Sequence, residues 1–314
     1  MTSPAQDDLA RLLETLAGGR DPSSIEITSL SALRRDDVPR LRVAWEALPA
    51  SQRERLIVRA AELAEDDATL DFLEVSRLAM TDPDPVVRQR GVESLWESED
   101  RHVGDDLTWV LQNDAEESVR AAAAVSLRGY VLRRELEEFD EVLGDAVVAA
   151  LRSRVEDVTE DVEVRARSLE ALGFRSLPWV DSLITTAYYH DDLRMRTAAV
   201  HAMGASADEK WLEYLYEALH SDEVEMRFEA AAACGSIASE EAVDSVAVLL
   251  DDDDSDVAIA AAQALGEISG PAAVQYLREF ATRAPEGLEE TVRDAIELAL
   301  FGMEGRTEED DESY

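Results

Sequence analysis

The chain has 314 residues, of which 70 are acidic and 30 are basic, and its formal net charge is −40 at pH 7. Nonspecific binding to nucleic acid depends on cationic side chains that displace counterions from phosphates, so this charge argues against a nucleic-acid partner. Hydrophobic residues make up 46% of the chain and aromatic residues only 6%, which is typical of a core of alanine, leucine and valine between closely packed helices.

Arginine almost replaces lysine, because Lys210 is the only lysine in the chain. Such an acidic, arginine-rich composition agrees with a high-salt cytoplasm and equally with a GC-rich genome, and both explanations stay open. The first residues lack the basic start and the apolar run of a secretory signal. No stretch reaches the roughly 18 apolar residues of a membrane-spanning helix. We therefore expect a cytoplasmic protein that does not associate with membranes.

Residues 1–67 predict an irregular helical cap. Within them, residues 5–17 suggest a short amphipathic helix and residues 36–48 a second one. Ser51 and Glu54 have the spacing of a capping box, which predicts the start of a third helix. An atypical unit is expected at the end of a repeat array, because a terminal unit must present one polar face to water.

Residues 68–302 contain a repeated helix start, whose period is 31 residues between Asp161 and Gly266. In each regular copy an apolar anchor residue follows an acidic residue by three positions and precedes a glycine by nine. The anchors, with less regular copies on both sides, are Val87, Val119, Val164, Met195, Met226, Val257 and Val292. Self-similarity at this period predicts one array of six or seven helical hairpins.

Three further features of the array follow from its spacing. Val119 and Val164 are 45 positions apart, which predicts an inserted block at residues 130–145. The repeated glycines are expected to end helices or to permit close packing; they are Gly173, Gly204, Gly235 and Gly266. Residues 303–314 are acidic and lack apolar anchors, which predicts a disordered tail.

The helix start, D-x-x-V-R-x-x-A-x-x-x-L-G, resembles HEAT repeats, in the short variety of about 30 residues found in phycobilisome-lyase-like HEAT proteins. The resemblance covers residues 68–302. It implies an all-α fold, namely a right-handed α-solenoid of HEAT-like helical hairpins of the armadillo type. Proteins with this fold are mostly scaffolds and adaptors, and a minority are enzymes. The resemblance therefore implies a noncatalytic scaffold that binds a protein through its concave surface, with carboxylates that favour a basic partner.

The competing hypothesis is an enzyme or an enzyme accessory. The resemblance admits a bilin-lyase-like protein. Another HEAT class, the deoxyhypusine hydroxylases, binds two irons through His-Glu pairs. None of the four histidines here, at positions 102, 190, 201 and 220, is followed by glutamate, so the ligands of that iron site are missing. The acidic run at residues 251–256 lacks the glycine and the bidentate glutamate of an EF-hand. The sequence thus predicts no catalytic residue, metal site or cofactor.

Several recurring or conspicuous residues have structural explanations. An arginine follows six of the seven anchors, and the acidic residue three positions before each anchor can pair with it within or between repeats, which predicts a ladder of ion pairs in place of a basic binding stripe; the arginines are Arg88, Arg120, Arg165, Arg196, Arg227 and Arg293. Cys234, the one cysteine, occupies a position that is apolar in related repeats, which predicts a core side chain. The five tryptophans do not recur in phase, so we expect them to anchor first helices or repeat junctions; they are Trp45, Trp96, Trp109, Trp179 and Trp211.

Candidate partner-binding residues lie two, three and six positions after an anchor, where the second helix of each hairpin is expected to face the inner surface. Phe228 and Ile259 are large apolar residues at the same position of adjacent repeats, and His201 lies one repeat earlier. Gln263 and Arg167 occupy similar outward positions. These five residues predict an exposed patch for a protein partner. The alternative is that Phe228 and Ile259 contact only each other.

Overall fold

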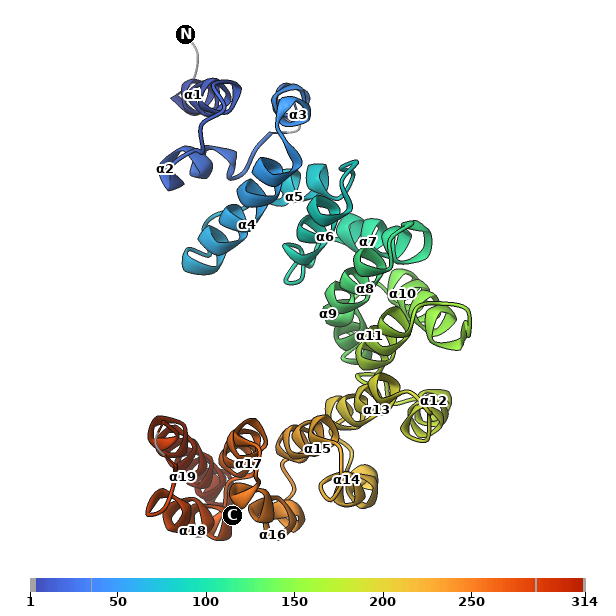
Figure 1. The fold of residues 1–314 in the computed structure, drawn as a ribbon, viewed down its shortest axis with the longest axis vertical. Helices are drawn as coiled ribbons and strands as arrows, with labels where there is room; N and C mark the ends of the chain where they lie inside the picture. Colours follow the sequence, from blue (N-terminus) through green and yellow to red (C-terminus); the bar gives the residue numbers. More distant parts are fainter. Residues whose placement is uncertain (1–3, 35, 286, 313–314) are drawn as a thin grey trace. The chain divides into compact units, whose positions relative to one another are not determined.

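The computed structural model describes residues 4–34, 36–285 and 287–312, and these residues form α-helices and short 3-10 helices without any strand (Figure 1). The all-α fold predicted from the sequence is therefore confirmed. The chain divides into two compact units, Met1–Arg167 and Ser168–Tyr314. Each unit is described by itself below.

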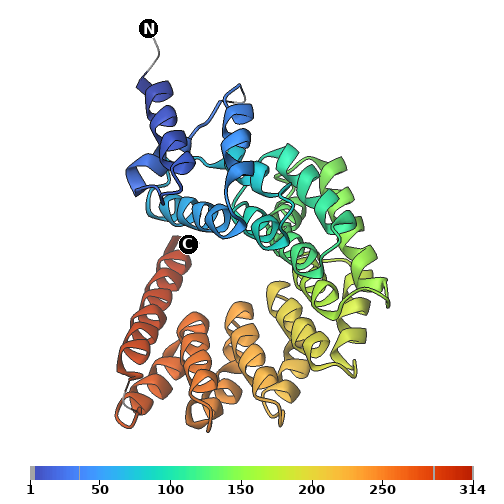
Figure 2. The ribbon, with the colours of Figure 1, turned by 45° about the horizontal axis from the view of Figure 1, so that its top comes forward.

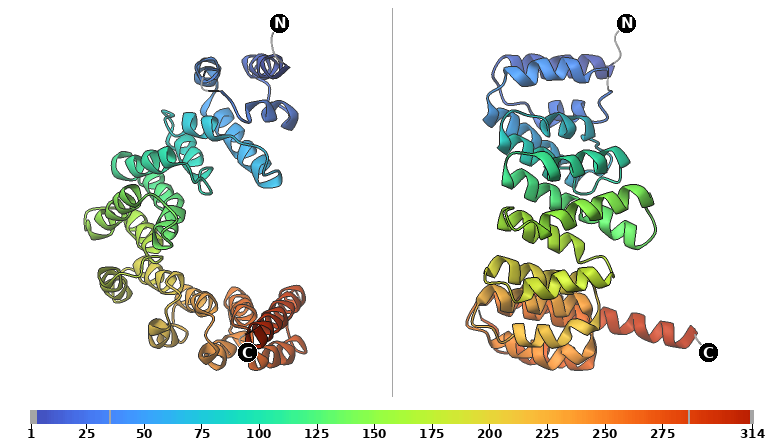
Figure 3. Two further views of the ribbon diagram at one scale, coloured as in Figure 1. Left: turned by 180° about the vertical axis from the view of Figure 1, so that it is seen from behind. Right: turned by 90° about the vertical axis from the view of Figure 1, so that its right-hand side faces the viewer.

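The first unit consists of short helices that pair in succession, and Figure 3 shows these helices (blue to green) stacked one on the next. Their order along the chain is α1 (Pro4–Ala17), α2 (Ser24–Ile27), the 3-10 helix η1 (Thr28–Leu30), α3 (Val38–Ala47), α4 (Ala50–Asp66), α5 (Leu73–Ala79), α6 (Pro85–Glu93), α7 (Arg101–Asn113), α8 (Glu117–Ser126), α9 (Arg128–Glu135), α10 (Glu141–Glu156) and the start of α11 (Val162–Leu172).

The capping box of the N-terminal region lies on another helix than the sequence predicted. Pro49 is the N-cap residue of α4 and no side chain caps that helix, so the capping box expected at Ser51 and Glu54 is wrong. A complete capping box forms instead at Ser23 and Glu26 on α2. Hydrogen bonds from the Thr15 hydroxyl, and then from Ser23, lower the pKa of Glu26 to about 2. This carboxylate therefore joins α1 to α2.

A buried charged cluster connects α3, α4 and the segment before α6. The Asp82 carboxylate is fully buried, and its Oδ2 lies 2.8 Å from Nε of Arg53, whose side chain is 9% exposed. The indole Nε1 of Trp45 donates a 2.6 Å hydrogen bond to the same carboxylate, and the backbone N–H of Asp84 donates another. One acidic group thus satisfies polar donors from three segments of the first unit.

The second unit repeats one helical hairpin several times. After the end of α11 its helices are α12 (Pro178–Tyr188), α13 (Leu193–Ala205), η2 (Glu209–Trp211), α14 (Leu212–Ala218), α15 (Val224–Ile237), η3 (Glu240–Ala242), α16 (Val243–Ala247), η4 (Val248–Asp251), α17 (Ser255–Ile268), α18 (Pro271–Ala281) and α19 (Glu289–Glu312). Within this unit α13, α15 and α17 lie on one side, and α12, α14 and α16 lie on the other. Figure 2 shows the former three helices (yellow to orange) side by side.

The seven predicted anchors are all buried, each on the second helix of a hairpin. Their exposed fractions do not exceed 5%. Aspartates three positions before three of them cap these helices, because Asp84, Asp192 and Asp254 accept hydrogen bonds from backbone N–H groups of the first turn. The interpretation of the repeated segment as a helix start is confirmed.

The repeated glycines permit close packing between successive second helices. Gly204, Gly235 and Gly266 lie inside the last turns of α13, α15 and α17. A Cβ atom added at these residues would approach the next second helix too closely, at 2.7 Å from Cα of Ala233, 2.9 Å from Cα of Ala264 and 3.1 Å from Cα of Ala295. Of the two roles predicted for these glycines, close packing is the one that the structure confirms for Gly204, Gly235 and Gly266.

The arginine ladder joins consecutive repeats. Arg88 binds Asp114 with 2.8 and 2.9 Å hydrogen bonds, and Arg227 binds Asp252 in the same two-pronged way. Arg120 pairs similarly with Glu160. Each of these arginines also donates to the backbone carbonyl six residues earlier, at the end of its own first helix. The hydrogen bonds from Arg227 lower the pKa of Asp252. The structure thus confirms ion pairing for these three arginines, but their partners are not the acidic residues three positions before the anchors that the sequence suggested.

Two segments outside the regular array are helical. The inserted block contributes α9, an extra helix whose Tyr130 and Val131 are buried.

Helix α19 continues to Glu312, which corrects the expectation of a disordered tail for residues 303–312; residues 313–314 lie outside the described residues. Buried Val292 and Ala299 fix the first turns of α19. Extension of an existing helix by residues rich in glutamate costs little.

Candidate protein-binding surfaces

The first candidate surface is the second-helix layer of the second unit, defined as α13, α15 and α17. Its helices approach each other closely at the repeated glycines, so the small residues between them are buried and the outward positions carry the exposed side chains. His201 lies on α13, Phe228 on α15, and Ile259 and Gln263 on α17. The layer therefore contains four of the five predicted site residues.

Exposure differs among these four residues. Phe228 is 38% exposed. Gln263 is exposed, whereas Ile259 and His201 are half-buried. Nδ1 of His201 lies 3.4 Å from a carboxylate oxygen of Glu229 on α15. An apolar ring thus neighbours a carboxylate in sequence on the outward face of α15.

Arg167, the fifth predicted residue, is the last residue of the first unit. Its Nε lies 2.6 Å from a carboxylate oxygen of Glu163, one turn earlier on α11. Arg167 therefore lies in the first unit and is not part of the second-helix layer.

A second candidate surface, which the sequence did not predict, is a row of three adjoining hollows along α4 in the first unit. Their volumes are about 610, 260 and 330 Å³. Val58 and Arg90 line both the first and the second hollow, and Ala61 and Glu97 line both the second and the third. We call this continuous depression the α4 groove.

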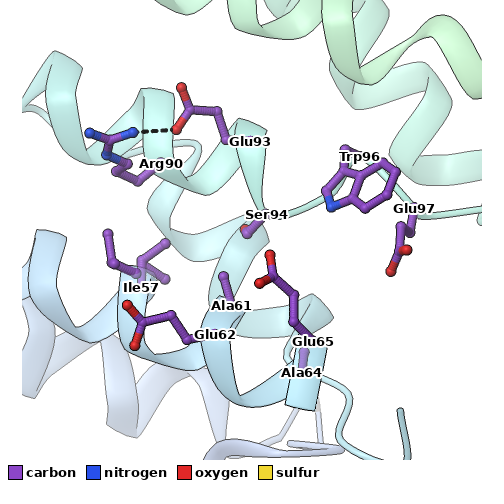
Figure 4. A pocket seen from close by; sticks show the side chains of 11 residues that line it. Ile57, Ala61, Glu62, Ala64, Glu65, Arg90, Glu93, Ser94, Trp96 and Glu97 are labelled. Carbon is purple, nitrogen blue, oxygen red and sulfur yellow. Dashed lines mark hydrogen bonds and ion pairs between the residues drawn. The ribbon is translucent and has the colours of Figure 1, made fainter. Parts of the chain in front are cut away.

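Figure 4 shows the middle of the α4 groove. Helix α4 contributes an apolar floor and the carboxylates of Glu62 and Glu65, and the segment that follows α6 contributes Trp96 and Glu97. The indole of Trp96 is 50% exposed. An aromatic ring of this size beside several carboxylates is suited to an apolar or cationic partner group.

Three arginines around the α4 groove already have acidic partners. Arg55 pairs with Asp21 at 3.0 Å, Arg59 with Glu62 at 2.6 Å and Arg90 with Glu93 at 2.7 Å. Glu65 and Glu97, in contrast, form no ion pair with any residue that the structure describes. The groove therefore carries excess negative charge near Trp96.

The tryptophans differ from their predicted role in two cases. Trp45 and Trp211 are buried as expected. Trp96 and Trp109 are 50% and 62% exposed, which disagrees with the prediction that they anchor first helices or repeat junctions. Trp109 lies on the face of α7 opposite the buried Leu107 and Leu111. The only indication in the sequence that these two residues lie outside the repeat core is that they do not recur in phase with the repeat.

No group of three or more His, Cys, Asp or Glu residues in the described part of the chain is arranged to hold a metal ion. Within the acidic run 251–256, Asp254 caps α17, Asp252 binds Arg227 and Asp251 binds Arg283. Each of these aspartates thus has a structural partner. Likewise, no helix among the described residues combines the length and apolar character that a membrane crossing requires.

The Cys234 thiol is expected to be unreactive in the folded protein. It is fully buried, and burial raises its pKa to about 12. At pH 8 only about one thiol in ten thousand would be ionised, and the thiolate is the reactive form. We expect Ellman's reagent to label no cysteine in native protein and one per chain in urea. Complete labelling of the native protein at pH 8 would contradict the core role.

Comparisons with known proteins agree with the helical repeats. The family model for HEAT repeats matches residues 148–232 and 212–300. The complex of CpcE and CpcF of phycocyanin lyase from Nostoc sp. PCC7120 is similar in structure, with a TM-score of 0.53 and 18% identity over 78% of this chain and 94% of that chain.

Importin beta is similar with a TM-score of 0.50 and 14% identity over 94% of this chain and 47% of that chain. Kap95p gives a TM-score of 0.53 and 13% identity over 94% of this chain and 45% of that chain. No curated protein matches the sequence. At these identities the structural likeness concerns the fold. The family match identifies HEAT repeats in residues 148–300, and the structural likeness together with the stacked hairpins gives the chain an α-solenoid fold.

Proposed function

We propose that the chain is a noncatalytic scaffold that binds a basic protein partner through the second-helix layer of the second unit. The proposal rests mainly on the exposure of Phe228, an aromatic side chain that is 38% exposed on the outward face of α15. Contiguous exposed apolar patches that polar residues surround mark protein-binding surfaces. Ile259 and Gln263 on α17 and His201 on α13 would extend the contact along the layer.

The charge of the chain supports a basic partner. Its net charge of −40 attracts cationic proteins over long distances and repels acidic ones, which raises the association rate for the former.

Aspartate substitutions test this proposal. The double variant Phe228→Asp/Ile259→Asp is expected to lose a basic partner isolated from the native host on the wild-type protein, and its dissociation constant should rise at least about tenfold in calorimetric titration. Its melting temperature should stay unchanged if the two residues face a partner. The matched control is Val248→Asp on η4, an apolar residue that is 62% exposed outside the layer.

Two outcomes would contradict the proposal. Unaltered affinity in the double variant would exclude the layer as the contact surface. A large fall in melting temperature would instead support the alternative that Phe228 and Ile259 pack on each other.

The second candidate function is an accessory of a bilin lyase. It is favoured by the similarity in fold to the CpcE and CpcF complex. An absorption spectrum of protein purified from its host distinguishes the candidates, because a bound bilin absorbs visible light and a protein scaffold alone does not. A stoichiometric chromophore would overturn the noncatalytic proposal.

A further inference from the structure

We propose that the α4 groove binds an amphipathic helix of a basic protein, with one arginine or lysine side chain against Trp96 and between Glu65 and Glu97. This inference rests on the proposed function as a protein-binding scaffold. It adds a contact surface in the first unit that is separate from the second-helix layer.

The length of the groove suits a helical segment. Its hollows follow α4 from Ser51 in the first to Glu65 in the second and then reach the loop at Phe72. The fourteen residue steps from Ser51 to Glu65 correspond to about 21 Å at the rise of an α-helix. A ligand helix of about four turns spans the same distance.

The floor of the groove offers apolar contacts. Val58 is 37% exposed on α4 although it lies one position from buried Ile57. Ala61 and Ala64 are small, so they leave room above the helix for side chains of a ligand. Apolar residues of an amphipathic helix, at spacings of three and four, can pack into such a groove.

The backbone of the groove favours a helical ligand over an extended one. Helices α4 and α6 use their backbone N–H and C=O groups internally, so their walls offer side chains and no strand edge. An extended peptide would lose hydrogen bonds to water without regaining them from the protein. A helix satisfies its own backbone and avoids this cost.

Charge determines the polar side of the ligand. Arg55, Arg59 and Arg90 are already paired with acidic groups, whereas Glu65 and Glu97 have no ion-pair partner among the described residues. Figure 4 shows both carboxylates near the exposed indole of Trp96. A guanidinium or ammonium group there would gain two carboxylate contacts and a cation–π contact.

Labelled 15-residue helical peptides test the inference by fluorescence anisotropy. The probe carries leucines at positions i, i+4 and i+7 and arginines on one flank, and its counterpart has glutamates in place of the arginines. We expect saturable binding of the basic probe and none of the acidic counterpart. Trp96→Ala should weaken binding about three- to thirtyfold, as should the charge-removing double variant Glu65→Gln/Glu97→Gln.

Matched variants separate this surface from others. Trp109→Ala removes an equally exposed tryptophan on α7 and should leave binding unchanged. Phe228→Asp/Ile259→Asp should also leave probe binding unchanged, since it alters only the second unit. Circular dichroism melts should show that every variant remains folded.

Three results would overturn the inference. The first is failure of the basic probe to saturate the protein at 100 micromolar, which is about a hundred times a dissociation constant of one micromolar. The other two results are equal binding of both probes, and a Trp109→Ala variant that weakens binding as much as Trp96→Ala does.

The two proposals can fail separately. Loss of probe binding by wild type with retained, Phe228-dependent partner binding would remove the α4 groove and keep the proposed function. Binding of the probe without any partner whose binding depends on Phe228 would keep the α4 groove and remove the proposed function.

Discussion

Replacing Asp82 with alanine is expected to lower the free energy of unfolding of the first unit by about 3–5 kcal/mol. The substitution removes the partner of Arg53, whose side chain is 9% exposed, and leaves its charge buried without compensation. It also leaves the Trp45 indole N–H without its 2.6 Å acceptor. Urea unfolding followed by circular dichroism measures the loss, and hydrogen exchange of α3 to α6 locates it.

An exposed ion pair provides the control for Asp82. Arg59 and Glu62 are each about half exposed, so Arg59→Ala should change stability by no more than about 1 kcal/mol. Replacing both charged residues, as Arg53→Met/Asp82→Leu, should recover part of the loss because no buried charge then remains. Equal effects of Asp82→Ala and Arg59→Ala would show that the buried cluster contributes little.

Gly204→Ala is the second substitution with a large expected effect, a loss of about 1–3 kcal/mol of stability in the second unit. Alanine ordinarily stabilises a helix relative to glycine by about 1 kcal/mol. Here the new methyl group would lie 2.7 Å from Cα and 2.8 Å from Cβ of Ala233 on α15. Because the nearest atom belongs to the backbone, α13 and α15 must move apart, which opens gaps along their whole contact.

Gly129→Ala on α9 is the matched control. A Cβ atom there meets only the Trp96 carbonyl oxygen, at 3.9 Å, so the helix gains stability without a clash. Thermal melts of both variants should shift in opposite directions. A stabilised Gly204→Ala variant would mean that α13 and α15 tolerate wider separation, and the close-packing explanation of the repeated glycine would fail.

The repeated part of the fold could be predicted because one physical requirement recurs in each copy. Anchors such as Val164 and Met226 must be buried, and a glycine must follow them where two helices approach. Periodicity displays such requirements directly in the sequence. The arginine ladder was predictable for the same reason, although the choice of Asp114 and Asp252 as partners depends on the contact between repeats.

Features that occur once were harder to predict. Ser51 and Glu54 have the spacing of a capping box, but Pro49 is already the N-cap residue of α4, and the box forms at Ser23 and Glu26. Local spacing does not reveal which of two candidate boxes the surrounding helices support. The α4 groove was missed because its lining comes from α1, α2, α4, α5, α6 and the loops between them, and no single periodic pattern records their proximity.

The shielded arginine pairs predict how the stability of the protein depends on dissolved ions. In the pairs of Arg88, Arg120 and Arg227 no side chain is more than 16% exposed. Mobile ions weaken interactions between exposed charges beyond about 10 Å at 0.1 M but reach covered pairs poorly. Salt should therefore relieve the mutual repulsion of surplus carboxylates and spare the attractions between neighbouring hairpins, and we expect it to raise the melting temperature.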